Sequence, residues 1–131
     1  MILCESVVED VRTHNKSIQN AYNTIWSAKF PVRHDRFTMF VSLTGIHGEQ
    51  EFKVSVAGIT KDEASGKPLL ELGGKIRSSD PRDVVDVTLD MRGIVIPQAG
   101  DYEIKVYVGE HQVGTRRFMA KVAEGPGKAE N

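Results

Sequence analysis

The chain is short of several residue types, and each shortage narrows what the protein can be. Cys4 is the only cysteine among 131 residues, so no disulfide can form within the chain. No apolar run approaches the roughly 20 residues that span a bilayer. The first residues, MILCESVVED, also lack the basic region that begins a signal peptide. We therefore predict a cytoplasmic protein that does not enter a membrane.

Excess charge of either sign is absent as well. The chain has 17 Lys and Arg against 18 Asp and Glu, and its formal net charge is −1. Proteins that bind the phosphate backbone usually present a concentrated basic surface, whereas the basic residues here are spread along the chain. Arg116 and Arg117 form a pair and not a patch. We therefore expect no nucleic-acid partner.

The length and composition fit one soluble domain. The chain is 40% hydrophobic and 27% charged, which is ordinary for a globular protein, and 131 residues are too few for two domains of usual size. We predict a single domain over residues 1–123. Residues 124–131, EGPGKAEN, contain no side chain that could anchor them in a core, so we predict a flexible tail.

Strict alternation of apolar and polar residues is the main pattern in the chain. EFKVSVAG (51–58) and DYEIKVYVG (101–109) each place apolar side chains at every second position, as in strands with one buried face. No comparable helical stripe competes. We predict an all-β fold, a two-layer antiparallel β-sandwich of about eight strands. The expected strands are 2–9, 17–26, 37–45, 50–60, 69–77, 84–94, 101–109 and 112–122.

Turn residues separate these segments at regular spacing. GIHGEQ (45–50), KDEASGKP (61–68), SSDPRD (78–83) and IPQAGD (96–101) all contain Gly or Pro. VGEHQV (108–113) predicts a tight hairpin, with Gly109 able to take the positive φ that such turns require.

The order of these segments resembles a small family of bacterial proteins of unknown function. The likeness covers most of residues 1–122, and it lies in Glu5 to Val8, Asn15-Lys16, Tyr22 to Trp26, Phe30-Pro31, Gly48-Glu49 to Val54, and Gly100 to Gly114. It implies an immunoglobulin-like or jelly-roll-like sandwich without an assigned activity. It brings no catalytic residue to this chain.

YNTIW (22–26) combines aromatic and amide side chains and allows two interpretations. Tyr22 and Trp26 could stack on a sugar ring or a base, with Asn23 supplying hydrogen bonds. Alternatively, Trp26 is a core side chain at one end of the sandwich. The second interpretation is favoured, because a lone Trp in a small β domain usually lies in the core.

The candidates for catalysis and metal binding are the four histidines and Cys4. A structural zinc site needs about four ligands, commonly in short paired spacings, and the spacing here provides none. His34 beside Asp35 and the loop residue His111 are the best candidates for a base or ligand. Cys4 fits an inert core residue. We predict no catalytic residues, no metal and no cofactor.

Sheet edges are the remaining candidates, because unpaired backbone groups can pair with another chain. VYVGEHQVGTRRF (106–118) is the best such segment, with Tyr107 and Phe118 as apolar contacts. Lys105, Arg116 and Arg117 could instead protect that edge. We predict a non-enzymatic module that binds a protein partner or a second copy, for example as a homodimer. The alternative is a small-ligand or carbohydrate site near Tyr22 and Trp26.

Overall fold

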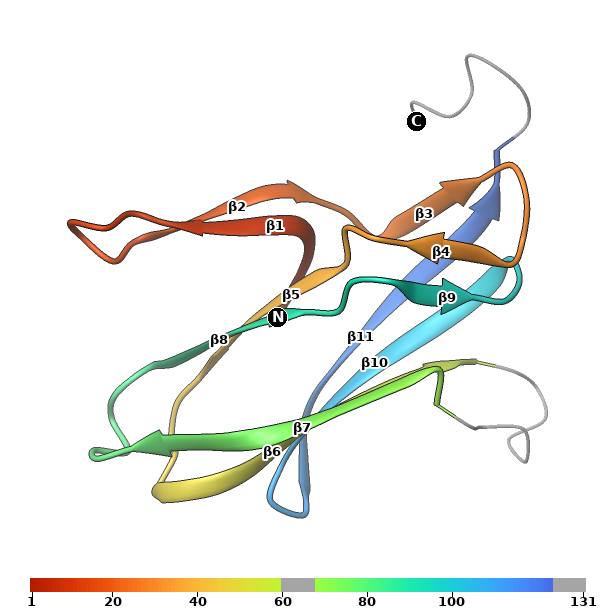
Figure 1. Ribbon diagram of the computed structural model, residues 1–131. Coiled ribbons are helices and arrows are strands. Elements are labelled where there is room, and N and C mark those ends of the chain that lie inside the picture. The colour runs from red at the N-terminus through yellow and green to blue at the C-terminus, as the bar shows by residue number, and fades with distance from the viewer. Residues whose placement is uncertain (60–67, 124–131) are drawn as a thin grey trace.

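The computed structural model describes residues 1–59 and 68–123, which form eleven strands (Figure 1). Within these residues the model has no helix that is long and apolar enough to cross a bilayer. Most of the loop predicted at 61–68, and the tail predicted at 124–131, lie outside the described residues.

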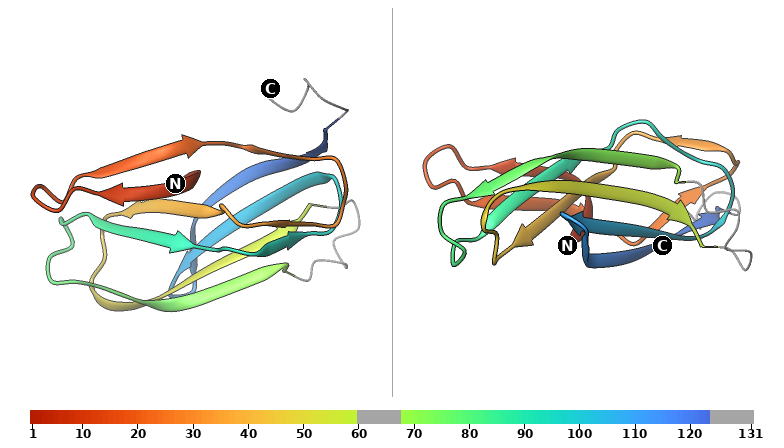
Figure 2. Two further views of the ribbon diagram at one scale, coloured as in Figure 1. Left: turned by 45° about the horizontal axis from the view of Figure 1, so that its top comes forward. Right: turned by 90° about the horizontal axis from the view of Figure 1, so that it is seen from below.

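The strands form two packed sheets and one short ribbon (Figure 2). The first sheet contains, in spatial order, β2 (Lys16–Ala21), β1 (Ile2–Glu9), β5 (Thr38–Leu43) and β8 (Val85–Asp90). The second sheet contains β3 (Thr24–Ser27), β11 (His111–Val122), β10 (Gly100–Val108), β6 (Gly48–Gly58) and β7 (Leu70–Ser78). The ribbon pairs β4 (Val32–His34) with β9 (Ile94–Ile96).

Alternation along the strands produces the core between the sheets, so the predicted all-β sandwich is confirmed. The second sheet buries the apolar positions of β6 and β10, and the first sheet buries those of β1 and β5. The innermost side chains, each at most 4% exposed, include Leu3, Phe37, Met39, Val41, Phe52, Val54, Val56, Tyr102, Ile104, Val106 and Phe118. In β6 and β10 the intervening positions are less buried and mostly polar, as the period of two requires.

The strand predicted at 17–26 is two strands in different sheets. β2 ends at Ala21, and the chain crosses to the second sheet before β3 begins at Thr24. Asn20 takes a positive φ of 53° at this crossing, a conformation that Asn tolerates better than most residues. β3 then pairs with β11 in parallel. The prediction of a wholly antiparallel sandwich is therefore wrong at this pair of strands.

The strand predicted at 84–94 is also interrupted, at Met91–Gly93, where Gly93 has a φ of 75°. Beyond the break the chain continues as β9, which pairs with β4, a strand that the sequence did not predict. The β4–β9 ribbon thus extends the β5–β8 pair around one end of the sandwich. These two breaks and the additional β4 explain why the sequence predicted about eight strands and not eleven.

The predicted hairpin between β10 and β11 is confirmed. Gly109 has a φ of 61°, and its N–H donates to the carbonyl of Glu51 at 2.8 Å. The turn predicted at 45–50 is shorter in the structure, because β6 begins at Gly48 and residues 44–47 connect it to β5. Gly45 and Gly48 both have positive φ.

Candidate functional site

Tyr22 and His34 form a packed corner where the chain changes sheets. The Tyr22 hydroxyl donates to the carbonyl of Arg36 at 2.8 Å and lies 3.1 Å from Nε2 of His34. Because the hydroxyl has one proton, the second contact is made by an N–H of His34. Burial raises the pKa of Tyr22, and burial lowers the pKa of His34 more than its bond with the Arg36 backbone raises it. Both groups are therefore neutral near neutral pH and hold β4 against the β2–β3 crossing.

Trp26 lies away from this corner. Ile25, which is 3% exposed, occupies the core position of β3, and Trp26 is half-buried on the outer face of the strand. The Nζ of Lys121 lies 5.6 Å from the centre of the Trp26 ring. Asn23 is exposed, and its side-chain oxygen accepts from the Thr24 hydroxyl at 3.0 Å. Trp26 is thus not the buried core side chain that the sequence favoured.

The four histidines lie on four different segments. Nδ1 of His14 lies 3.2 Å from a carboxylate oxygen of Glu9, His47 is exposed in the loop before β6, and His111 is exposed at the start of β11. In the part of the chain that the structure describes, no group of three or more His, Cys, Asp or Glu could hold a metal ion. Cys4 is fully buried, as predicted, and burial raises the pKa of its thiol. A raised pKa leaves little reactive thiolate.

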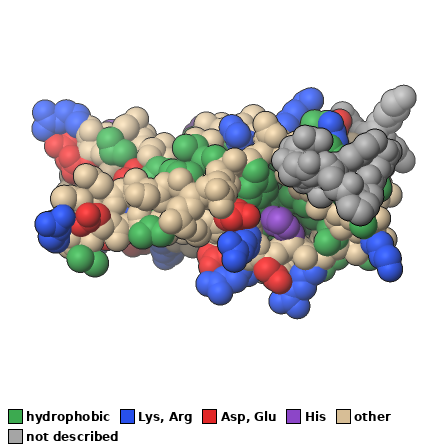
Figure 3. Space-filling model, turned by 90° about the horizontal axis from the view of Figure 1, so that it is seen from above, with side chains coloured by type: hydrophobic (Ala, Val, Ile, Leu, Met, Phe, Trp, Pro, Cys, Tyr) green, Lys and Arg blue, Asp and Glu red, His purple; other side chains and the backbone are tan. Residues whose placement is uncertain are grey.

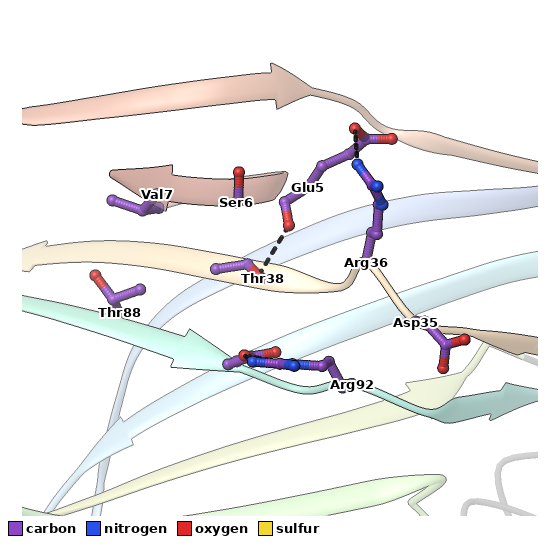
Figure 4. A pocket seen from close by; sticks show the side chains of 9 residues that line it. Glu5, Ser6, Val7, Asp35, Arg36, Thr38, Thr88 and Arg92 are labelled. Atoms are coloured by element: carbon purple, nitrogen blue, oxygen red, sulfur yellow. Dashed lines mark hydrogen bonds and ion pairs between the residues drawn. The ribbon is translucent and has the colours of Figure 1, made fainter. Parts of the chain in front are cut away.

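A polar hollow of about 510 Å³ lies over the first sheet, between β1, β5 and β8 (Figure 4). Its charged side chains interact with each other. Arg36 lies 3.4 Å from Glu5, and Arg92 lies 2.7 Å from Asp90. The hydroxyl of Thr38 donates to the Glu5 carbonyl at 3.2 Å. Because these pairs are internally matched and largely exposed, the hollow has no unmatched charge for a ligand to recognise.

Charge is similarly mixed over the outer surface. In Figure 3, Lys and Arg side chains alternate with Asp and Glu, and no continuous area of one sign covers the visible face.

Of the two aromatic residues predicted to contact a partner, only Tyr107 is on the surface. It lies on the outer face of the second sheet, with the Nζ of Lys53 5.2 Å from its ring centre. Phe118 is 1% exposed, stacks on Tyr102 with ring centres 5.3 Å apart, and meets Phe37 edge-on at 5.4 Å. Phe118 is therefore a core residue and not a surface contact.

One strand in the interior of the second sheet, β11, is only partly paired on one side. β10 pairs with β11 from His111 to Ala120, but β3 pairs only with Met119–Val122 (Figure 1). Residues 111–118 therefore have no neighbouring strand on their second side among the described residues. We call this stretch the open β11 edge.

The direction of the unpaired backbone groups follows from the adjoining paired ones. Met119 donates its N–H to the carbonyl of Asn23, which precedes β3, at 2.9 Å. Alternate residues of a strand direct their N–H groups to the same side. Thr115 and Arg117 therefore present their N–H and C=O groups to the open side, where another strand could pair with them.

Two adjoining hollows of about 300 and 550 Å³ border this edge. The opposite side of these hollows is formed by β5. β1 pairs with β5 only as far as the pairing of Ile2 with Phe40, so residues 41–43 of β5 also have one unpaired side. The lining is mixed. Its polar side chains include Ser42, Gln50, Thr115 and Arg116, and its apolar side chains are Met1, Val41, Leu43, Ile46, Val106, Val108 and Val113. Thus β5 in the first sheet and β11 in the second are each unpaired on one side where they border the same groove.

The fold and this groove define a class: a small all-β sandwich with an unpaired strand edge beside a groove of mixed polarity. The model of a family of unknown function (DUF6941) matches residues 1–121, and the chain belongs to that family. A comparison with curated proteins gives no match.

Proposed function

We propose that this protein is a non-enzymatic binding module that recruits another polypeptide by strand addition at the open β11 edge. The observation that carries the proposal is that β3 stops pairing at Met119, which leaves Thr115 and Arg117 with backbone groups directed outward. An extended segment that joins such an edge gains main-chain hydrogen bonds, and its alternate side chains enter the adjoining groove. Exposed edges are normally protected, so an open edge beside a groove with several apolar side chains supports a binding function.

The location of the protein is part of the proposal. A single, buried Cys4 is compatible with a reducing compartment, and we place the protein in the bacterial cytoplasm.

The proposal is tested by blocking the edge with minimal change to the fold. Thr115→Pro removes the outward N–H and leaves the β10 side of β11 intact, because proline is tolerated where the N–H would face solvent. Thr115→Val is the matched control: it also removes the hydroxyl contact with Glu103 at 3.1 Å but keeps the backbone donor.

Both variants are compared with wild type in pull-downs from the native cell and in sedimentation across protein concentrations. We expect a complex or self-association that survives Thr115→Val and is lost with Thr115→Pro. A complex that is equally strong with both variants would place the binding surface elsewhere.

A further inference from the structure

Arg116 is an unusual residue for its position on β11. It pairs with Ile104, which is fully buried, and lies between Gly114 and the core residue Phe118 on the inner face of the strand. Charged side chains seldom occupy inward-facing positions unless they are paired. Arg116 extends from this position into the smaller hollow, beside Met1, Val41 and Leu43.

The guanidinium of Arg116 has no partner among the described residues. Its Nε is buried and makes no hydrogen bond, and Arg116 takes part in none of the ion pairs among the described residues. Its neighbour Arg117 differs: it faces outward, largely exposed, with its Nε 3.9 Å from Glu103. A buried donor without an acceptor is destabilising. Because this Nε is closed off from solvent, the Arg116 side chain has to turn toward the groove before an acceptor there can satisfy it.

A carboxylate is the acceptor that this position favours. The guanidinium presents a planar set of donors that matches a carboxylate in a two-point contact. None of the described residues that line the smaller hollow is acidic. The acid must therefore come from the molecule that fills the groove.

The charge of the edge argues against a second copy as that molecule. The segment HQVGTRRFMAKV, residues 111–122, contains Arg116, Arg117 and Lys121 and no Asp or Glu. Pairing this strand with itself would bring basic side chains opposite each other, which is destabilising in a β-ladder. An acidic strand would be complementary.

We infer that the partner is an extended segment of a different protein that carries an Asp or Glu at the position facing Arg116. The inference rests on the proposed function, because it names the kind of chain that joins the open β11 edge. The segment pairs with the backbone of Thr115 and Arg117, and its apolar side chains enter the groove between β11 and β5. Its carboxylate accepts from Arg116.

The test uses the full chain and short synthetic peptides that alternate Val and Thr with Glu, Gln or Lys. Binding is measured by calorimetry, and the amide signals of residues 111–118 are followed by NMR. We expect the Glu peptide to bind and to shift the amides of Thr115 and Arg117. Arg116→Met should weaken this binding about tenfold or more, since a charge-assisted pair is lost, whereas Arg117→Met should change it much less.

The variants separate this inference from the proposed function. If Glu, Gln and Lys peptides bind equally and Thr115→Pro abolishes binding of all three, strand addition stands and the acidic partner is wrong. If no peptide moves the amides of the open edge, both are wrong. Self-association that Thr115→Pro abolishes and Arg116→Met strengthens would make a second copy the occupant, and would also overturn the inference.

Discussion

Replacing Arg116 with methionine should make the isolated protein more stable. The change removes the buried Nε that lacks an acceptor and keeps an unbranched side chain of similar reach beside Val41 and Leu43. Leaving a buried donor unsatisfied costs about 1–3 kcal/mol. Arg116 is only partly buried overall, so the lower end applies. We expect a gain of about 1 kcal/mol in the free energy of unfolding, or about 4 °C in Tm for a domain of this size.

The assay is urea unfolding followed by circular dichroism, with Arg117→Met as the matched control. Arg117 is an adjacent arginine on the exposed face, where its loose pair with Glu103 contributes little, so its replacement should leave stability within about 0.5 kcal/mol. If Arg116→Met is no more stable than Arg117→Met, the Nε is satisfied in solution, and the main reason for seeking an external acceptor disappears. A more stable variant that no longer binds acidic peptides would show that stability is sacrificed for recognition.

Three further outcomes test other parts of the structure. Gly109→Ala should lower the free energy of unfolding by about 1 kcal/mol in urea, because a φ of 61° is strained for any residue with a side chain. Gly74→Ala is the control and should not lower it, because Gly74 has no positive φ and open space where the Cβ would lie. Trp26 fluorescence should be quenched by iodide more than by caesium, because Lys121 lies over the ring; insensitivity to both would mean a buried indole. Burial lowers the pKa of His34 from its ordinary 6.5, so the unfolded chain binds a proton at this residue more readily than the folded one. The free energy of unfolding should therefore fall as pH drops from about 7 to about 5. If the urea midpoint of the wild type changes with pH in the same way as that of His34→Gln, this reasoning is wrong.

The parts of the fold that could be predicted from the sequence are those where a local pattern coincides with a continuous strand. In β6 and β10 every second residue is buried and turn residues stand at both ends, so the alternation and the turn residues predict the same strand. The same reasoning missed the crossing between β2 and β3, because YNTIW continues to alternate while the chain leaves one sheet for the other. The flanking Asn20 and Asn23 were the available signal, since Asn accepts a positive φ.

The candidate site was predictable only as a segment. Alternation identified β11 as a strand, but which of its sides lacks a neighbour depends on where β3 stops, a pairing between residues about a hundred positions apart. The sequence also could not predict which residues of β11 face the core. Phe118 and Arg116 both face inward, but the bulge near Val106 shifts the register between β10 and β11, so counting alternate residues from the hairpin gives the wrong face. From the sequence, Arg116 could therefore be interpreted as a surface charge that protects the edge of the sheet. The structure shows instead that it faces inward.

The first sheet provides a comparison that strengthens the case for an external acidic strand. β8 is an edge strand with acidic residues on its polar face, and a second copy could in principle offer it to β11. However, Asp86 already accepts from the Ser42 hydroxyl at 2.7 Å, and Asp90 is paired with Arg92 at 2.7 Å. Using them would require breaking these contacts before any new one forms. A partner strand with a carboxylate that has no such contacts avoids that loss. The β8 edge and the open β11 edge therefore differ in what they can offer, because Asp86 and Asp90 on β8 already have contacts and the Nε of Arg116 has none among the described residues.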